Sequence, residues 1–191
     1  RLYDSTTTAS GSILTVTSGV SGESLSLTGS GVLGAASAGT QTITNNNTLT
    51  IADGSGGLAS NYTLSGATIN VTIIPRTLNV TLSREYDGTT SVSGASLTPT
   101  FDSLQGGETL ALSGTGSVST ANVGSSKAVS LGSIALAAGS GNPSNYSLNL
   151  ATMNITQRVI NLDGIRAYDA TTNVLSSDIN TFGNIVSGET L

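Results

Sequence analysis

The sequence predicts an all-β (mostly β) protein made of tandem small β-domains, each about 82 residues long. Three observations predict this fold class. Apolar and polar residues alternate over short stretches, which is the period of a half-buried strand. Glycine-rich, Asp-Gly and Asn-Pro turn signals separate these stretches. The same motifs also recur in the same order at a fixed distance, which is typical of repeated domains.

The clearest strand is predicted at residues 77–83, which read Thr-Leu-Asn-Val-Thr-Leu-Ser. Residues 68–73 and 109–113 have the same period of two. Because no long segment shows the helical period of 3.6, we expect five to seven short strands in each repeat. A sandwich is the first interpretation of these strands, and a β-grasp-like sheet with one short helix is the alternative.

The repeat is defined by two motifs. Tyr3-Asp4 recurs as Tyr86-Asp87 and Tyr168-Asp169, at spacings of 83 and 82 residues, with an arginine two residues before each tyrosine. The motif Gly-Glu-Ser/Thr-Leu recurs at 22–25, 107–110 and 188–191. These spacings predict three units: repeat 1 at 1–75, without its first strand; repeat 2 at 76–157, complete; and repeat 3 at 158–191, truncated.

The junctions between repeats are short. Residues 73–76 read Ile-Ile-Pro-Arg and residues 156–158 read Thr-Gln-Arg, so no Gly/Ser linker separates one strand from the next. Short junctions restrict hinge motion. We therefore expect the repeats to be arranged end to end as a rod, and the chain, which starts at Arg1 without an initiator methionine, to be a piece of a longer array.

The composition argues against several function classes. The chain has no His and no Cys, which excludes a Ser-His-Asp triad and a cysteine nucleophile. Six basic residues and a net charge of −5 argue against nucleic-acid binding. No apolar run approaches the roughly 20 residues of a membrane span. We therefore expect no enzyme activity, no catalytic residues and no membrane insertion.

The few charged and aromatic residues lie mostly at equivalent positions of the repeats. A residue that recurs in every unit can serve the fold of every unit, whereas an active site is rarely needed three times. We therefore interpret the recurring residues as a structural signature. In repeat 2 this signature comprises Arg84, Tyr86, Asp87, Gly88, Thr89, Thr90, Glu108 and Tyr146.

The aspartate of the signature is predicted to cap a turn. Its carboxylate would accept hydrogen bonds from the backbone N–H groups that follow it. Ser5 and Ala170 stand where repeat 2 has Gly88, so a left-handed conformation is not expected at this position. The second interpretation is that Asp4, Asp87 and Asp169 bind Ca²⁺ together with the repeated glutamate, although no Asp-x-Asp-x-Asp calcium loop is present. No other cofactor is expected.

The Asn-Tyr-x-Leu motif is predicted to open a strand. The ring of Tyr146 would then be buried, with its hydroxyl at the rim of the core. The alternative is an exposed tyrosine that stacks on a sugar. Because every aromatic residue has a plausible role in the core of its repeat, the buried arrangement is preferred.

Together these motifs resemble a known family. Tyr86-Asp87-Gly88-Thr89-Thr90, Ala121-Asn122-Val123-Gly124 and Asn145-Tyr146-Ser147-Leu148, in this order, are similar to the YDG-type repeat of large secreted bacterial exoproteins, which include haemagglutinin-like adhesins of two-partner secretion. The resemblance covers all of repeat 2. Repeats 1 and 3 match less well because they lack the glycine of the signature.

The resemblance implies a secreted or bacterial cell-surface protein. Its repeats would form a stalk or spacer that projects a distal binding region for attachment to cells or within a biofilm. The implied partners are the neighbouring repeats of the same chain and, through other domains, a host-cell or matrix glycan or protein. The alternative is a glycan- or matrix-binding module within such an adhesin.

Overall fold

The computed structural model describes residues 1–18 and 20–190, with the side chain of Leu150 outside the description. Leu191, the last residue of the third Gly-Glu-Thr-Leu motif, also lies outside the described residues. Strands hold 44% of the residues and helical residues 8%, all of them in 3-10 turns of three residues, so the predicted all-β class is confirmed. Within the described residues, no helix has the length and apolar character needed to cross a bilayer.

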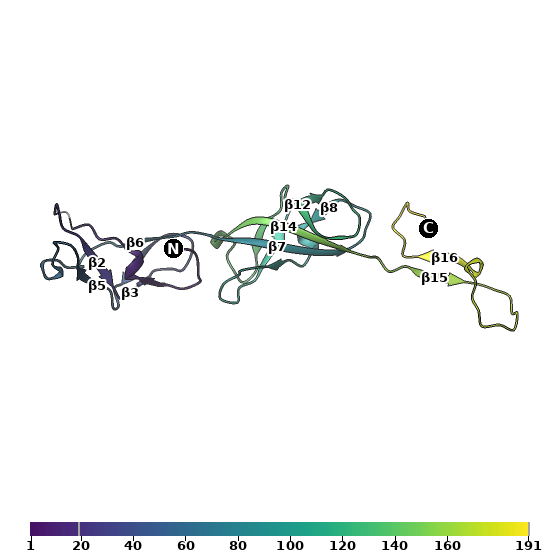
Figure 1. Cartoon of the computed structure of the whole chain (residues 1–191), viewed down its shortest axis with the longest axis horizontal. Helices are drawn as coiled ribbons and strands as arrows, with labels where there is room; N and C mark the ends of the chain where they lie inside the picture. The colour runs from purple at the N-terminus through teal and green to yellow at the C-terminus, as the bar shows by residue number, and fades with distance from the viewer. Residues whose placement is uncertain (19, 191) are drawn as a thin grey trace. The chain divides into compact units, whose positions relative to one another are not determined.

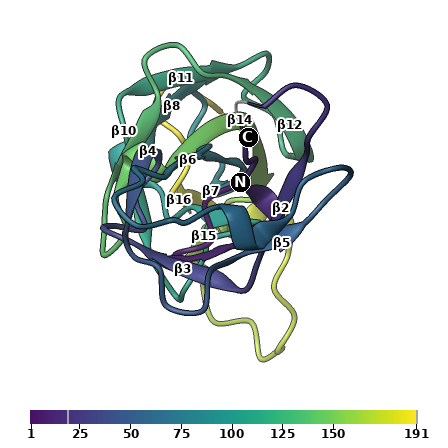
Figure 2. The ribbon, with the colours of Figure 1, turned by 90° about the vertical axis from the view of Figure 1, so that its left-hand side faces the viewer.

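Repeat 1 forms two antiparallel sheets. Its elements are β1 (Thr8–Ser10), η1 (Gly11–Ile13), β2 (Leu25–Thr28), β3 (Ser30–Leu33), β4 (Gly39–Asn45), β5 (Thr50–Asp53), η2 (Ala59–Asn61) and β6 (Asn70–Ile73). The larger sheet has the order β1-β3-β4-β6. In the smaller sheet β2 pairs with β5, and the two strands lie side by side in Figures 1 and 2. The 3-10 turn η2 directly precedes Tyr62.

Repeat 2 has the same elements plus a long first strand and one further short strand. Its elements are β7 (Arg76–Glu85), β8 (Ser91–Ser93), η3 (Gly94–Ser96), β9 (Thr100–Phe101), β10 (Leu110–Ser113), β11 (Thr115–Val118), β12 (Gly124–Ser130), β13 (Ala135–Ala138), η4 (Pro143–Asn145) and β14 (Tyr146–Thr156). The six-stranded sheet has the order β8-β11-β12-β14-β7-β9, and β10 pairs with β13. The predicted strand at 77–83 is the centre of β7.

Repeat 2 contains eight strands, one more than the largest number expected. The two strands without a counterpart in repeat 1 are β7 and β9. Gly114, with a φ of 77°, separates β10 from β11, as Gly29 separates β2 from β3. A Cβ atom at this position would lie 2.1 Å from the carbonyl oxygen of Ser133. Only glycine fits both the conformation and the space, so the turn between β10 and β11 depends on Gly114.

Repeat 3 forms one antiparallel pair in its described part. β15 (Asn161–Gly164) pairs with β16 (Ile179–Gly183), and the 3-10 turn η5 (Ser176–Asp178) precedes β16. The apolar residues Val159, Leu162 and Ile165 are 69%, 51% and 82% exposed. The first strand of this repeat therefore leaves most of its apolar surface in solvent.

The chain divides into two compact units whose limits differ from those of the sequence repeats. The first unit comprises residues 1–79, 101–112 and 136–149, and the second comprises 80–100, 113–135 and 150–191. Each compact unit therefore combines residues of two successive repeats.

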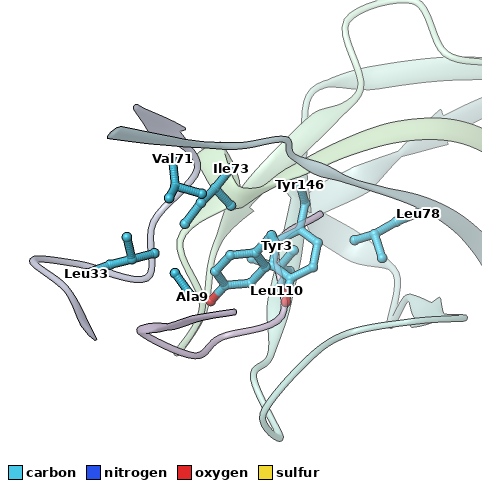
Figure 3. Close-up of a cluster of buried hydrophobic side chains, with 8 residues drawn as sticks. All are labelled: Tyr3, Ala9, Leu33, Val71, Ile73, Leu78, Leu110 and Tyr146. Carbon is cyan, nitrogen blue, oxygen red and sulfur yellow. The ribbon is translucent and has the colours of Figure 1, made fainter. Parts of the chain in front are cut away.

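Each unit has its own apolar core. In the first unit the core consists of Tyr3, Ala9, Leu33, Val71, Ile73, Leu78, Leu110 and Tyr146 (Figure 3). In the second unit the buried apolar residues include Val80, Leu82, Val92, Val118, Val129, Ile134, Ala151, Met153 and Ile155. The alternation of the strands explains these sets, since Leu78, Val80 and Leu82, at every second position of β7, are buried.

Candidate functional site

The repeated Arg-x-Tyr-Asp segment forms the same turn in all three repeats. The backbone N–H groups of Thr6, Thr89 and Thr171 donate to the Asp two residues earlier at 3.0, 2.9 and 3.0 Å. The hydroxyl of each threonine donates to the same carboxylate oxygen. The aspartate therefore caps the turn, as the sequence predicted.

The arginine of each motif closes the turn from the other side. Arg84 donates to Asp87 at 2.9 Å, to the hydroxyl of Thr89 at 3.2 Å and to the carbonyl of Ser91 at 2.7 Å. Arg1 and Arg166 pair with their own aspartates in the same way. Because one guanidinium holds a carboxylate and several carbonyl groups, it fixes the shape of the whole turn.

One prediction about this turn is wrong. Ser5, Gly88 and Ala170 all adopt the left-handed conformation, with φ of 61°, 73° and 59°. The absence of glycine in repeats 1 and 3 had argued against this conformation. The hydrogen bonds of the Asp cap and of the arginine hold the backbone there even when the residue carries a side chain.

The aspartates of the turns have lowered pKa values in two repeats. For Asp4, burial raises the pKa, but the hydrogen bonds from Thr6 and Arg1 outweigh it and hold the pKa below its usual value. For Asp169, the backbone and hydroxyl hydrogen bonds of Thr171 lower the pKa. These carboxylates are therefore engaged by the turn itself.

The Ca²⁺ interpretation required the repeated aspartate and glutamate to act together. The structure gives them separate partners, since Asp87 bonds with Arg84 and Thr89, whereas Glu108 bonds with two tyrosines. Over residues 1–18 and 20–190, no group of three or more acidic or histidine side chains is placed to hold a metal ion.

The most specific arrangement in the chain is a Tyr–Glu–Tyr cluster in the first compact unit, formed by Tyr3, Glu108 and Tyr146. The hydroxyl groups of Tyr3 and Tyr146 donate to the two carboxylate oxygens of Glu108, each at 2.6 Å. The two tyrosine rings lie next to each other (Figure 3). They meet edge to face, with their centroids 5.3 Å apart. Both rings are buried, at 3% and 5% exposure, so the cluster joins apolar packing to a charged hydrogen-bond acceptor.

Further hydrogen bonds fix the cluster in place. The backbone N–H of Gln105 donates to the hydroxyl of Tyr146 at 3.0 Å, and Arg76 donates to the carbonyl of Tyr3 at 3.0 Å. The side chain of Asn145, which is 4% exposed, accepts from the backbone N–H of Ala38 at 2.8 Å. Residues of repeat 1 and repeat 2 thus bond to each other inside one compact unit.

The buried hydroxyl groups of the cluster resist ionisation. Burial, with the hydrogen bond to Glu108 as the next cause, raises the pKa of Tyr3 to about 12. Burial and the same glutamate also raise the pKa of Tyr146. An ionised phenol would stand beside a carboxylate in an apolar surrounding, which both effects oppose.

The other repeats reproduce parts of the cluster. Tyr62 donates to Glu23 of its own repeat, and Tyr86 donates to Glu189 of the next repeat. Arg158 donates to the carbonyl of Tyr86 at 3.3 Å, as Arg76 does to that of Tyr3. Each repeated glutamate thus accepts a hydrogen bond from a repeated tyrosine. The donor is the second tyrosine of the same repeat for Glu23 and the first tyrosine of the preceding repeat for Glu189. Glu108 accepts from both kinds of tyrosine.

Sequence reasoning placed Tyr146 correctly, since it opens β14 with its ring buried and its hydroxyl bonded at the edge of the core. It missed that the glutamate joins tyrosines of two repeats. The only signal was that the glutamate and both tyrosines recur together. That recurrence does not say which repeat supplies each partner.

The geometry therefore defines an all-β protein of tandem repeats in which recurring tyrosines donate to recurring glutamates. A family model described as the YDG domain matches residues 1–71 and again residues 70–155. Because these two matches cover most of the chain, it belongs to the YDG domain family. No curated protein and no solved structure matches the chain.

Proposed function

We propose that this chain is a stalk or spacer segment of a secreted or surface-anchored bacterial adhesin. Its role is to carry a distal binding region away from the cell surface, for attachment to cells or within a biofilm. The number of repeats then sets the reach. In this role the repeats have no catalytic task, and their partners are the neighbouring repeats.

The observation that carries this proposal is the Tyr3–Glu108–Tyr146 cluster. It buries the first tyrosine of one repeat against the glutamate and second tyrosine of the next. A spacer needs junctions that do not bend freely, and hydrogen bonds to a charged acceptor, each contributing about 1.5–3 kcal/mol, give such a junction a defined geometry.

Small-angle X-ray scattering of the 191-residue chain tests the proposal. The expected result is the asymmetric distance distribution of a rod, with a maximum dimension that grows when a further repeat is added. Glu108→Ala should shift the distribution toward flexible, bent particles, whereas Glu85→Ala, a matched loss of one exposed carboxylate, should not. A compact, globular profile for the unmodified chain would contradict the proposal.

One observation favours a glycan- or matrix-binding module as a second candidate. Tyr168 is 94% exposed, which is how a sugar-stacking aromatic residue presents its ring. Its equivalents Tyr3 and Tyr86 bond to glutamates, however, so docking to another repeat accounts for Tyr168 as well. Binding to a glycan array that is lost in Tyr168→Ala would favour this second function.

A further inference from the structure

The first and last strands of repeat 2 are neighbours in one sheet. β7 opens the repeat and β14 closes it, and the two strands lie next to each other in the six-stranded sheet (Figure 1). With 10 and 11 residues, they are the longest strands in the described part of the chain. A force that pulls the two ends of this repeat apart therefore acts first on this pair of strands.

The two strands run in the same direction. Three pairs of polar side chains connect them by hydrogen bonds: Thr77 with Ser147 at 3.3 Å, Asn79 with Asn149 at 3.3 Å, and Thr81 with Thr152 at 3.4 Å. Beyond these pairs, the N–H of Tyr86 donates to the carbonyl of Thr156 at 2.9 Å. Because the residue numbers rise together along both strands, the pair is parallel. Tension on the repeat pulls β7 toward its amino end and β14 toward its carboxyl end, so the strands are driven past each other.

Apolar side chains on the other face oppose such sliding. Every second side chain is almost fully buried, at 2% exposure or less: Leu78, Val80 and Leu82 in β7, and Ala151, Met153 and Ile155 in β14. A shift by one residue would turn each strand's buried side chains to the opposite face. The strands can therefore slide only when these side chains leave the core and enter water, which is unfavourable.

Asn79 of β7 is also bonded to a neighbour on its other side. Its backbone N–H donates to one carboxylate oxygen of Asp102 at 3.1 Å, and its amide donates to the other at 2.7 Å. The N–H of Asp102 donates to the carbonyl of Asn79 at 3.3 Å. Hydrogen bonds to a charged acceptor are stronger than those between neutral groups. β7 is thus held on both edges, by Asp102 and by Asn149 of β14.

The connections to the neighbouring repeats are short. Two residues, Ile74 and Pro75, join β6 to β7, and four residues, 157–160, join β14 to β15. A short connection has little length to extend before it is taut. A pull on the chain is therefore transmitted directly to the ends of β7 and β14.

We propose that β7 and β14 form a mechanical clamp, with which the repeat withstands tension between its two ends. This inference rests on the proposed spacer function, because a spacer between a cell and an attached target is pulled at both ends. Under tension the parallel strands are loaded in shear, so that many bonds must break together. Strands that are peeled apart from one end lose the same bonds one after another.

Single-molecule force spectroscopy of the whole 191-residue chain tests the clamp. The chain has no cysteine, so a pair of introduced cysteines defines where the two handles attach. Handles at Pro75→Cys and Gln157→Cys, two exposed positions that flank the strands, load the pair in shear. Handles at Glu85→Cys and Gln157→Cys, at the same end of both strands, peel the pair apart. With either pair of handles, unfolding should lengthen the chain by about 25 nm, as expected for the chain between them at roughly 3.5 Å per residue.

The direction of pulling should determine the unfolding force. We expect a force at least about twofold higher in shear than in peeling, because forced unfolding follows the unfolding barrier. Only molecules with the full length step are counted, which ensures that repeat 2 was folded. Ile74→Cys, at a residue that is 53% exposed, gives the same direction of pull if Pro75→Cys does not fold. An equal or lower force in shear would overturn the clamp but not the spacer function, because a repeat that yields easily can still hold a binding region at a distance.

Asn79→Ala tests the side-chain bonds of the clamp. It should raise the rate of unfolding in shear at least about tenfold at a given force, because bonds to Asp102 and Asn149 are lost. Asn142→Ala is the matched control, since Asn142 is an exposed amide that bonds with Ser144 outside β7 and β14. It should leave the rate in shear unchanged. Equal acceleration by the two substitutions would show that general stability, and not the strand pair, determines the force.

Discussion

The residue that follows each repeated aspartate adopts a backbone conformation whose free-energy cost differs among the repeats. All three residues are left-handed, yet only Gly88 lacks a side chain. A left-handed conformation costs a residue with a side chain about 1–2 kcal/mol. Ser5 and Ala170 remain left-handed because the hydrogen bonds of the Asp cap and of the arginine stabilise the turn by more than this cost.

Ser5→Gly should therefore stabilise the first compact unit. The relief of the left-handed conformation exceeds the extra chain entropy that glycine gives the unfolded state, so we expect a gain of about 0.5–1 kcal/mol in the free energy of unfolding. Urea denaturation followed by circular dichroism measures it. Ser65→Gly is a matched control, since Ser65 is an exposed turn residue without a positive φ, and it should be neutral or destabilising. Equal effects of the two substitutions would contradict the argument.

The buried phenol of Tyr3 makes stability depend on alkaline pH. Its pKa is raised to about 12 from an ordinary value of 10.0, so the folded chain holds the phenolic proton more tightly than the unfolded chain. The stability that this proton provides is complete below pH 10 and is lost as the pH rises toward 12. The free energy of unfolding should fall by about 2 kcal/mol over this window because of Tyr3.

Comparison with Tyr3→Phe isolates this effect. Urea denaturation from pH 8 to 11.5 should show a shallower decline for Tyr3→Phe than for the unmodified chain, since phenylalanine has no proton to lose. Tyr168→Phe is the control, because Tyr168 is 94% exposed and should leave the decline unchanged. If the curves of the unmodified chain and Tyr3→Phe stayed parallel, the assignment would be wrong.

At the scale of elements, the Tyr–Glu–Tyr cluster joins the turn before β10, the start of β14 and the start of repeat 1. Glu108→Ala removes the acceptor for two buried hydroxyl groups, of which that of Tyr146 keeps a hydrogen bond from Gln105. An unsatisfied buried polar group costs about 1–3 kcal/mol. We expect Glu108→Ala to lower the free energy of unfolding of the first compact unit by about 2–3 kcal/mol, measured by urea denaturation.

A second acidic residue provides the matched control for Glu108→Ala. Glu85 pairs with Arg158 across 3.7 Å, and its side chain is 49% exposed. Exposed ion pairs contribute about 0–1 kcal/mol, so Glu85→Ala should have little effect. Similar losses for the two variants would show that the loss of one negative charge, and not the cluster, determines the result.

The elements themselves were the predictable part of the fold. Period-two alternation places β7 and the buried faces of Leu78, Val80 and Leu82 directly, because strand side chains alternate between two faces. The contacts between distant residues could not be predicted in this way. Nothing in the local pattern states that Tyr3 packs on Tyr146, 143 residues further along the chain, because long-range contacts depend on the whole topology. The left-handed Ser5 and Ala170 were missed for the same reason, since tertiary hydrogen bonds override local preference.

For the whole molecule, the sequence repeats and the compact units comprise different sets of residues. The sequence repeats end near residues 75 and 157, whereas the first compact unit takes in residues 101–112 and 136–149 of repeat 2. Tyr3, a residue of repeat 1, is buried in a core that Leu110 and Tyr146 of repeat 2 help to form. A repeat of this kind is completed by its neighbour, as in repeat proteins in which stability resides in nearest-neighbour contacts.

A chain cut at the repeat boundary should therefore be incomplete. Residues 1–75 alone lose Glu108, Leu110 and Tyr146 from the core of the first unit, which exposes the ring of Tyr3 and leaves its hydroxyl without an acceptor. We expect this piece to unfold without a cooperative transition, or with a free energy of unfolding at least about 3 kcal/mol lower than that of the first unit in residues 1–157. Urea denaturation and the dispersion of amide NMR signals compare the two pieces. Residues 1–157 with Tyr3→Ala should lie between them, because only one side of the shared core is then removed. Full stability of residues 1–75 would show that each repeat folds alone and that the shared cluster is a contact between finished domains.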